Sequence, residues 1–174
     1  LANLMASTIW ITGLSGSGKT TLANEIIKIL NNKNIPCIHL DGDNLRKILL
    51  FNDKKKHFSK ENRIKVSKIY SNLCELLNKN NINVVISTIS MFNDVFEYNK
   101  KNIKKISIVY LKIDLKKLKQ RNSKNLYSNK KKLKNIVGVD IEYDEPQNPN
   151  EIIEHFRLSD IKSLSQKLIK KYIK

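Results

Sequence analysis

Residues 13–20 read Gly-Leu-Ser-Gly-Ser-Gly-Lys-Thr, a composition and spacing suited to holding phosphate groups. The glycines allow a backbone path that turns several N–H groups toward one point. Lys19 adds a cation that can neutralise phosphate charge, and the Thr20 hydroxyl beside it can hold Mg²⁺. An accidental glycine turn is the alternative, but an apolar strand precedes this segment and an amphipathic helix follows it. We therefore predict a loop that binds a polyphosphate.

A second charged segment, Asp41-Gly42-Asp43-Asn44-Leu45-Arg46, follows the next apolar run. One carboxylate could orient or deprotonate an attacking hydroxyl while the other supports Mg²⁺ through water, and Arg46 could clamp an anion. The alternative is structural: Asp41 caps a helix that starts at Asn44 and pairs with Arg46. A cap and a ligand-binding position can coincide, so both roles of Asp41 stay open.

The elements that position these segments alternate between strands and helices. We predict strands at 8–12, 37–40, 83–87, 106–111 and 152–153, and helices at 20–30, 59–77, 92–100, 115–121 and 160–173. Right-handed crossovers then give an α/β fold with a mostly parallel sheet and helices on both faces. Ligands bind at the carboxyl ends of such strands, where both charged segments lie.

Length and composition limit the class of protein. The 174 residues suit one domain, and the two cysteines sit in apolar stretches, as buried thiols do. We expect a cytoplasmic protein without a membrane span, because the chain shows no signal-peptide pattern and no apolar run of about 18 residues. The net charge of +17 is spread along the whole chain, so we expect a solvated surface and no nucleic-acid partner.

One lysine-rich segment, residues 122–135, has few apolar anchors. A solvated loop is the plain interpretation. Phosphoryl transfer, however, needs a cover that excludes water and brings cations to the migrating group. We therefore predict that this segment is a lid.

These motifs together resemble the adenylylsulfate kinases, which use ATP and Mg²⁺ to phosphorylate the 3′-hydroxyl of adenosine 5′-phosphosulfate. The resemblance covers almost the whole chain and implies a three-layer P-loop NTPase fold and a homodimer. The segments that carry it are GLSGSGKTT at 13–21, LDGDNLR at 40–46, Phe58-Ser59 with Arg63, Ile89-Ser90, Leu126-Tyr127 and GVDIEYDEP at 138–146.

The resemblance also assigns roles to individual residues. Lys19 and Asp43 are implied to be catalytic, with Asp43 beside the acceptor hydroxyl and Thr20 on the metal. The residues implied to contact ATP are Gly13, Ser15, Gly16, Ser17, Gly18, Lys19, Thr20, Thr21 and Arg121. The residues implied to contact the acceptor nucleotide are Asp41, Asp43, Arg46, Phe58, Arg63, Ile89, Ser90, Lys124 and Leu126. Among these, Arg46 and Arg63 hold its 5′ anionic end and Phe58 stacks on its base.

The departures from the family pattern fall on the acceptor side. Val66 stands where the family has an asparagine, Lys68-Ile69 where it has two arginines, and Ile136-Val137 where it has Phe-Thr. A pocket that loses polar partners discriminates poorly for its former ligand. The pattern is therefore more similar to the branch of the family that phosphorylates cytidine 5′-diphosphoramidate for capsule polysaccharide, with adenylylsulfate as the alternative acceptor.

Three other classes are less consistent with the sequence. A sugar-acid kinase would share the phosphate loop but would need no base-stacking Phe58. A GTP switch would need an N-K-x-D element after the fourth strand, and none stands there. A nucleic-acid-stimulated ATPase would need a concentrated basic face with stacking aromatics.

Overall fold

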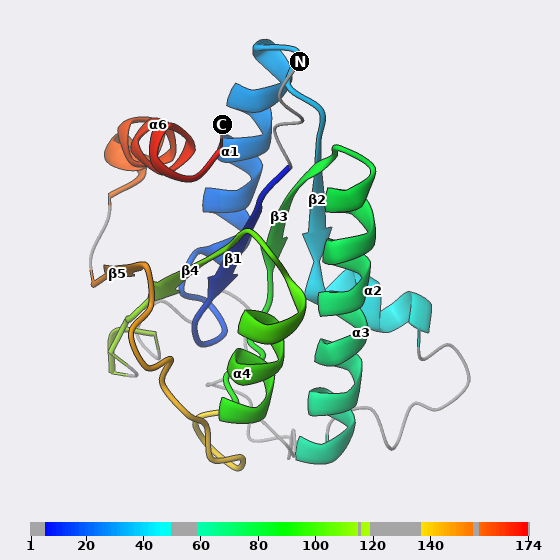
Figure 1. The fold of residues 1–174 in the computed structure, drawn as a ribbon. Helices are drawn as coiled ribbons and strands as arrows, with labels where there is room; N and C mark the ends of the chain where they lie inside the picture. The colour runs from blue at the N-terminus through cyan, green and yellow to red at the C-terminus, as the bar shows by residue number, and fades with distance from the viewer. Residues whose placement is uncertain (1–5, 50–58, 115, 119–136, 155–156, 174) are drawn as a thin grey trace.

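The sheet stands at the centre of the fold (Figure 1). The computed structural model describes residues 6–49, 59–114, 116–118, 137–154 and 157–173. Within them, five parallel strands run in the order β2-β3-β1-β4-β5. Their bounds are β1 Thr8–Thr12, β2 Cys37–Asp41, β3 Asn83–Ser87, β4 Ile106–Leu111 and β5 Glu151–Ile153. The predicted parallel sheet is confirmed.

Helices cover both faces of the sheet. Their bounds are α1 Lys19–Asn32, α2 Gly42–Leu49, α3 Lys60–Lys79, α4 Asn93–Asn102 and α6 Ile161–Tyr172, the last preceded by a 3-10 turn at Leu158–Asp160. One apolar core joins α3 and α4 to one face, and a second core joins α1 and α6 to the other. Strand β1 serves both cores because Trp10 points to the first and its neighbours Ile9 and Ile11 point to the second. The predicted three-layer α/β fold is confirmed.

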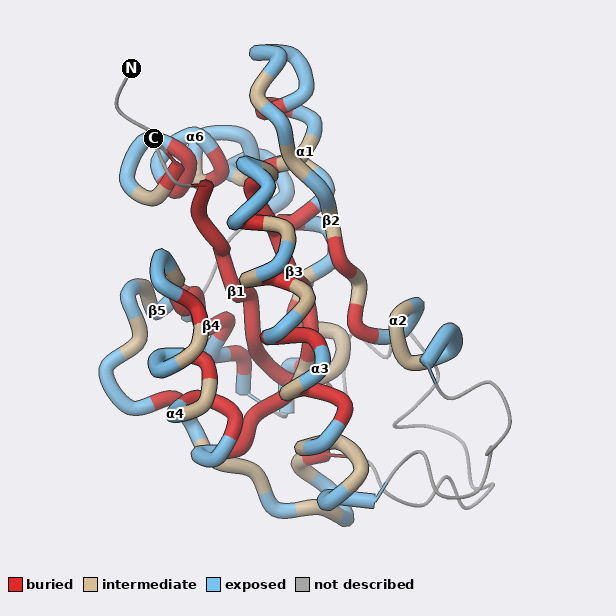
Figure 2. The backbone as a smooth tube through the Cα atoms, turned by 45° about the vertical axis from the view of Figure 1, so that its right-hand side comes forward, coloured by how far each residue is buried: buried red, intermediate tan, exposed pale blue. Residues whose placement is uncertain are grey.

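The central strands are buried along their whole length, as Figure 2 shows. Such strands read as continuous apolar runs, which is why the predicted bounds of β1, β3 and β4 match the structure. Edge strand β2 extends one residue beyond its predicted end, to Asp41, because that residue still pairs with Ser87. Of the predicted helix at 115–121, only residues 116–118 are described, and they are helical.

Two helix starts near the charged segments differ from the prediction. Helix α2 begins at Gly42 and not at Asn44. Helix α3 begins at Lys60, since Ser59 has an extended backbone and its hydroxyl accepts a hydrogen bond from the Asn62 N–H at 3.3 Å. Ser59 is therefore the N-cap of α3, as its residue type favours.

Cys74 is buried and Cys37 is half-buried, and both are free thiols. No helix in the described part of the chain is long and apolar enough to cross a membrane.

Candidate active site

The glycine-rich loop lies between the carboxyl end of β1 and the start of α1. Gly13, Gly16 and Gly18 have φ angles of 147°, 80° and 96°, a region that side chains rarely permit. A Cβ atom on Gly13 would also lie 2.6 Å from the carbonyl oxygen of Leu111. The sequence therefore needs glycine here for the turn and for close packing against β4.

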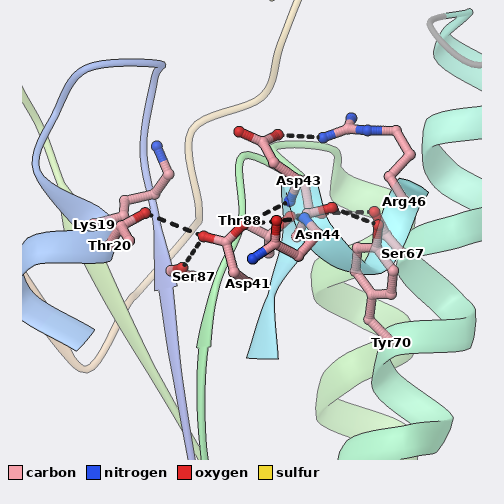
Figure 3. A network of polar contacts seen from close by, with 12 residues as sticks. Lys19, Thr20, Asp41, Asp43, Asn44, Arg46, Ser67, Tyr70, Ser87 and Thr88 are labelled. Carbon is pink, nitrogen blue, oxygen red and sulfur yellow. Dashed lines mark hydrogen bonds and ion pairs between the residues drawn. The ribbon is translucent and has the colours of Figure 1, made fainter. Parts of the chain in front are cut away.

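Lys19 and Thr20 stand in the first turn of α1, at the mouth of this loop. The Lys19 ammonium donates to the Leu14 carbonyl at 2.8 Å and reaches Ser17 Oγ at 3.5 Å, so it lies over the loop. The Thr20 hydroxyl donates to Asp41 Oδ2 at 3.1 Å, which ties the loop to the end of β2 (Figure 3). The two segments singled out in the sequence therefore meet in space.

Asp41 is the centre of this network. Its Oδ1 accepts from the N–H groups of Asp43 and Asn44, and its Oδ2 accepts from the hydroxyls of Thr20 and Ser87, all at 3.1 Å. An ionised carboxylate offers about four lone-pair positions, so these four bonds use its acceptor capacity. Asp41 therefore caps α2, as one interpretation of the sequence predicts, and it also holds the Thr20 hydroxyl.

Two residues that hold Asp41 in place, His39 and Ser87, were not predicted from the sequence. His39 Nε2 lies 2.9 Å from Ser87 Oγ, and the Ser87 proton goes to Asp41. His39 must therefore donate, because Ser87 has only one proton. Burial lowers the pKa of His39, opposed in part by the nearby Asp41. Parallel pairing aligns Asp41 with Ser87, and only that register would have pointed to the contact.

Asp43 pairs with Arg46, and this corrects the structural alternative in which Arg46 pairs with Asp41. Arg46 Nη2 lies 2.6 Å from Asp43 Oδ1, one helical turn away on α2. Arg63, on α3, belongs to the same cluster. Burial first, and the Arg46 charge second, lower the pKa of Arg63 to about 10. Two guanidinium groups thus share one neighbourhood, which favours an anionic ligand.

Ile89 and Ser90 follow β3 and complete the edge of the site. The Ile89 carbonyl accepts a hydrogen bond from the Thr12 hydroxyl, and Ser90 has a φ of 33°. Ser90 Oγ lies 2.7 Å from Thr88 Oγ1 and 2.6 Å from Ser67 Oγ. Both serines are buried, so this turn is held between β3 and α3.

These residues surround a cleft of about 600 Å³. Its lining consists of residues 15–21, Asp41, Asp43, Ser87, Thr88, Ile89, Arg157 and Leu158. A second cavity, of about 10 Å³, is lined by Arg46, Arg63, Val66, Ser67, Tyr70, Thr88, Ile89 and Ser90. Thr88 and Ile89 line both spaces, so the phosphate loop and the arginine cluster face adjoining spaces.

Some of the predicted site residues lie outside the described part of the chain, and other residues that line the two spaces were not predicted. Phe58, Arg121, Lys124 and Leu126, with the proposed lid at 122–135, lie outside the described residues. Arg157, between β5 and α6, was missed because its charge alone did not distinguish it among 33 lysines and arginines. Ser67 and Thr88 were missed because isolated hydroxyls carry no motif.

Known proteins resemble this chain over most of its length. The family model described as adenylylsulphate kinase matches residues 5–154. A cytidine diphosphoramidate kinase of Campylobacter jejuni is 39% identical over 141 residues, which are 80% of this chain and 81% of that protein. A probable adenylyl-sulfate kinase of Archaeoglobus fulgidus is 36% identical over 152 residues, 86% of this chain and 96% of that protein.

Solved structures give the same result. The APS kinase of Mycobacterium tuberculosis in complex with AMPPNP and APS superposes with a TM-score of 0.85 at 28% identity. The match covers 95% of this chain and 96% of that one. A shikimate kinase of Acinetobacter baumannii shares the fold alone, at 16% identity and a TM-score of 0.62. Loop, fold and relatives agree, and this chain belongs to the adenylylsulfate kinase family and is a phosphotransferase.

Proposed function

We propose that this kinase transfers the γ-phosphoryl group of ATP to the 3′-hydroxyl of a 5′-modified nucleotide, and that the acceptor is cytidine 5′-diphosphoramidate. One observation carries the proposal: the phosphate loop and the Arg46–Arg63 cluster line adjoining spaces that share Thr88 and Ile89. A nucleotide that lies in the larger cleft with its 5′ end at the arginine cluster would place its sugar hydroxyl near phosphates held by the loop. Direct in-line transfer requires this proximity.

The donor half of the cleft fits ATP with Mg²⁺. The loop and the N-terminus of α1 present N–H groups to phosphate oxygens. Mg²⁺ takes few protein ligands beside phosphates and water, and the Thr20 hydroxyl keeps its lone pairs available because its proton goes to Asp41. When bound, the metal neutralises phosphate charge. Lys19 stabilises the charge on the transferred group.

Asp43 is the residue assigned to the acceptor hydroxyl. Its side chain is 55% exposed and lines the same cleft as Lys19. The Asp43–Arg46 ion pair holds the carboxylate on the first turn of α2. In this position Asp43 orients the hydroxyl or accepts its proton. Asp41 holds Thr20 and the start of α2 and is not the base.

The acceptor half is assigned to the arginine cluster. Arg46 and Arg63 grip the 5′ anion of the nucleotide. Base stacking by Phe58, acceptor contacts by Lys124 and Leu126, and an ATP contact by Arg121 belong to the proposal and lie outside the described residues. We also propose that residues 1–174 form one domain, that residues 122–135 form a lid and that the protein is a homodimer.

Two observations favour the cytidine acceptor. The Campylobacter jejuni relative that carries this name is 39% identical to the chain. In addition, two positions at which the family pattern has polar side chains make other contacts here. Val66 is buried and apolar, and Lys68 Nζ lies 5.4 Å from the centre of the Tyr98 ring. The second candidate acceptor is adenylylsulfate, favoured by the 36% identical relative and by the structure with bound APS.

The proposal is tested by supplying MgATP with a panel of 5′-modified cytidine and adenosine nucleotides. We expect phosphorus NMR to show a new 3′-phosphate on cytidine 5′-diphosphoramidate. Exclusive use of adenylylsulfate would replace the first candidate with the second. A panel in which no nucleotide gains a 3′-phosphate, while ATP still binds, would overturn the nucleotide-kinase proposal.

Replacing Arg63 with alanine should mainly raise the KM for the acceptor. The guanidinium is assigned to the 5′ anion and not to the reacting atoms, so kcat and the KM for ATP should change little. Charge-assisted bonds of this kind support a change of about tenfold or more. Steady-state kinetics with each substrate varied would measure it.

Lys68→Ala is the matched control, because Lys68 lies on the same helix but contacts Tyr98. It should leave both KM values near those of the parent protein. An Arg63→Ala variant with an unchanged acceptor KM would remove Arg63 from the acceptor site.

A further inference from the structure

The small cavity beside the cleft is lined by two chemically different kinds of polar residue, arginines and residues with hydroxyl groups. It has a volume of about 10 Å³, close to the smallest space that holds one water-sized group. Arg46 and Arg63 are among the residues that line it, and guanidinium groups only donate hydrogen bonds. The hydroxyls that line the cavity belong to Ser67, Tyr70, Thr88 and Ser90. Each hydroxyl has one proton and two lone pairs, so the direction of its bond decides what it can offer a ligand.

Two of these protons point into the protein. The Tyr70 hydroxyl donates to the Gly42 carbonyl at 2.9 Å, and the Ser67 hydroxyl donates to the Arg63 carbonyl at 2.7 Å. A carbonyl oxygen can only accept, so neither assignment can be reversed.

The other two protons follow from the first pair. Ser67 Oγ lies 2.6 Å from Ser90 Oγ, and its own proton is already used, so Ser90 donates to Ser67. Thr88 Oγ1 lies 2.7 Å from Ser90 Oγ, whose proton is now also used, so Thr88 donates to Ser90. The chain of bonds therefore runs in one direction, from Thr88 through Ser90 and Ser67 to the Arg63 carbonyl.

All four hydroxyls thus offer only lone pairs to a group in the cavity. We propose that these hydroxyls select an acceptor whose 5′ end carries an N–H donor beside an anionic oxygen, as a phosphoramidate does. The cavity has room for one such group, so the terminal NH₂ enters it and donates to the hydroxyls, while the anionic oxygen stays with the arginines. A terminal sulfate has only oxygens that accept hydrogen bonds. One of them would face the hydroxyl oxygens with no proton between the two acceptors, and burying two acceptors in this way costs binding free energy. The inference rests on the proposed nucleotide kinase activity and names the group that this site reads.

The test compares two acceptors that differ only in the terminal group. Cytidine 5′-diphosphoramidate and cytidine 5′-phosphosulfate share the base, the sugar and the net charge, but only the first carries a terminal NH₂. We expect the wild-type protein to use the amidate with a kcat/KM at least about tenfold higher than the sulfate, the size expected for one buried hydrogen bond that is made or lost.

Ser67→Ala should weaken this preference. Without Ser67 Oγ, the Ser90 proton has lost its acceptor and can turn toward the cavity, where it suits a sulfate oxygen. We expect the ratio of the two kcat/KM values to fall by about tenfold, with the KM for ATP unchanged. Thr88→Val is the second variant, because it removes a hydroxyl that accepts a hydrogen bond from the amidate N–H but keeps the shape of the side chain. It should lower kcat/KM for the amidate more than for the sulfate.

Ser71→Ala is the matched control. Ser71 is buried one turn further along α3 and contacts Asn99 and the Ser67 carbonyl, but it does not line the cavity. It should keep the wild-type ratio. Equal use of both acceptors by the wild-type protein would overturn the inference, and so would a wild-type ratio in Ser67→Ala and Thr88→Val. In both cases the kinase activity would stand. Failure to phosphorylate either acceptor would instead overturn the proposed cytidine nucleotide kinase, and this inference with it.

Discussion

Replacing Lys19 with alanine should lower kcat by about 10²- to 10³-fold, the range seen when one charge-stabilising donor is removed from an active site. The Lys19 ammonium lies over the phosphate loop, 2.8 Å from the Leu14 carbonyl. From there it can follow negative charge as it spreads over the transferred phosphoryl group. The loss should appear in kcat and kcat/KM together, because the interaction is made most strongly in the transition state.

The measurement is single-turnover phosphorylation of the acceptor at saturating MgATP, with circular dichroism to confirm folding. Lys28→Ala supplies the control, since Lys28 lies on the same helix with a side chain 70% exposed and pairs only weakly with Glu25, at 3.9 Å. That variant should keep the parent rate. A Lys19→Ala enzyme as fast as Lys28→Ala would exclude the proposed role of the ammonium.

Replacing Asp43 with alanine should lower kcat by about 10²- to 10⁴-fold, the range typical of a general base. Asp43 lines the cleft beside the phosphate loop and is held by Arg46 at 2.6 Å. Because its removal also releases Arg46, the acceptor KM should rise as well. Asp43→Asn separates the two effects, since the amide oxygen can still accept from Arg46 but cannot take the proton of the hydroxyl.

The rates of both variants would be measured with ATP and acceptor each at saturation. Asp94→Asn is the control, an exposed aspartate in the first turn of α4. If Asp43→Ala turned over as fast as the parent protein, Asp43 would have no place in the mechanism. If Asp43→Asn kept the parent rate while Asp43→Ala lost it, the carboxylate would orient the hydroxyl without accepting its proton.

Much of the framework follows from local sequence. The buried central strands read as apolar runs with β-branched residues, so their bounds could be predicted closely at 8–12, 83–87 and 106–111. The phosphate loop could be predicted because its glycines, lysine and threonine act within one turn of chain. The Asp41–Arg46 segment could be placed at the same edge because parallel strands end together. These features depend on residues close in sequence.

The chemistry between elements was decided by the tertiary structure. Asp41 meets Ser87 across 46 positions because β2 and β3 pair in one register, and a shift of a single residue would turn Ser87 to the other face. Ser67 meets Ser90 only because α3 packs on the sheet with that side inward. Such contacts depend on register and helix rotation, which the packing of both cores sets.

The sequence by itself thus determined that a phosphate loop and a charged edge exist in an α/β kinase fold. Only the folded chain decided which hydroxyl donates to which oxygen between Thr88 and Arg63, and that Arg157 lines the cleft. The reason is physical. Local conformation follows from the side chains of neighbouring residues, whereas the direction of a hydrogen bond depends on partners that the chain brings together from distant positions.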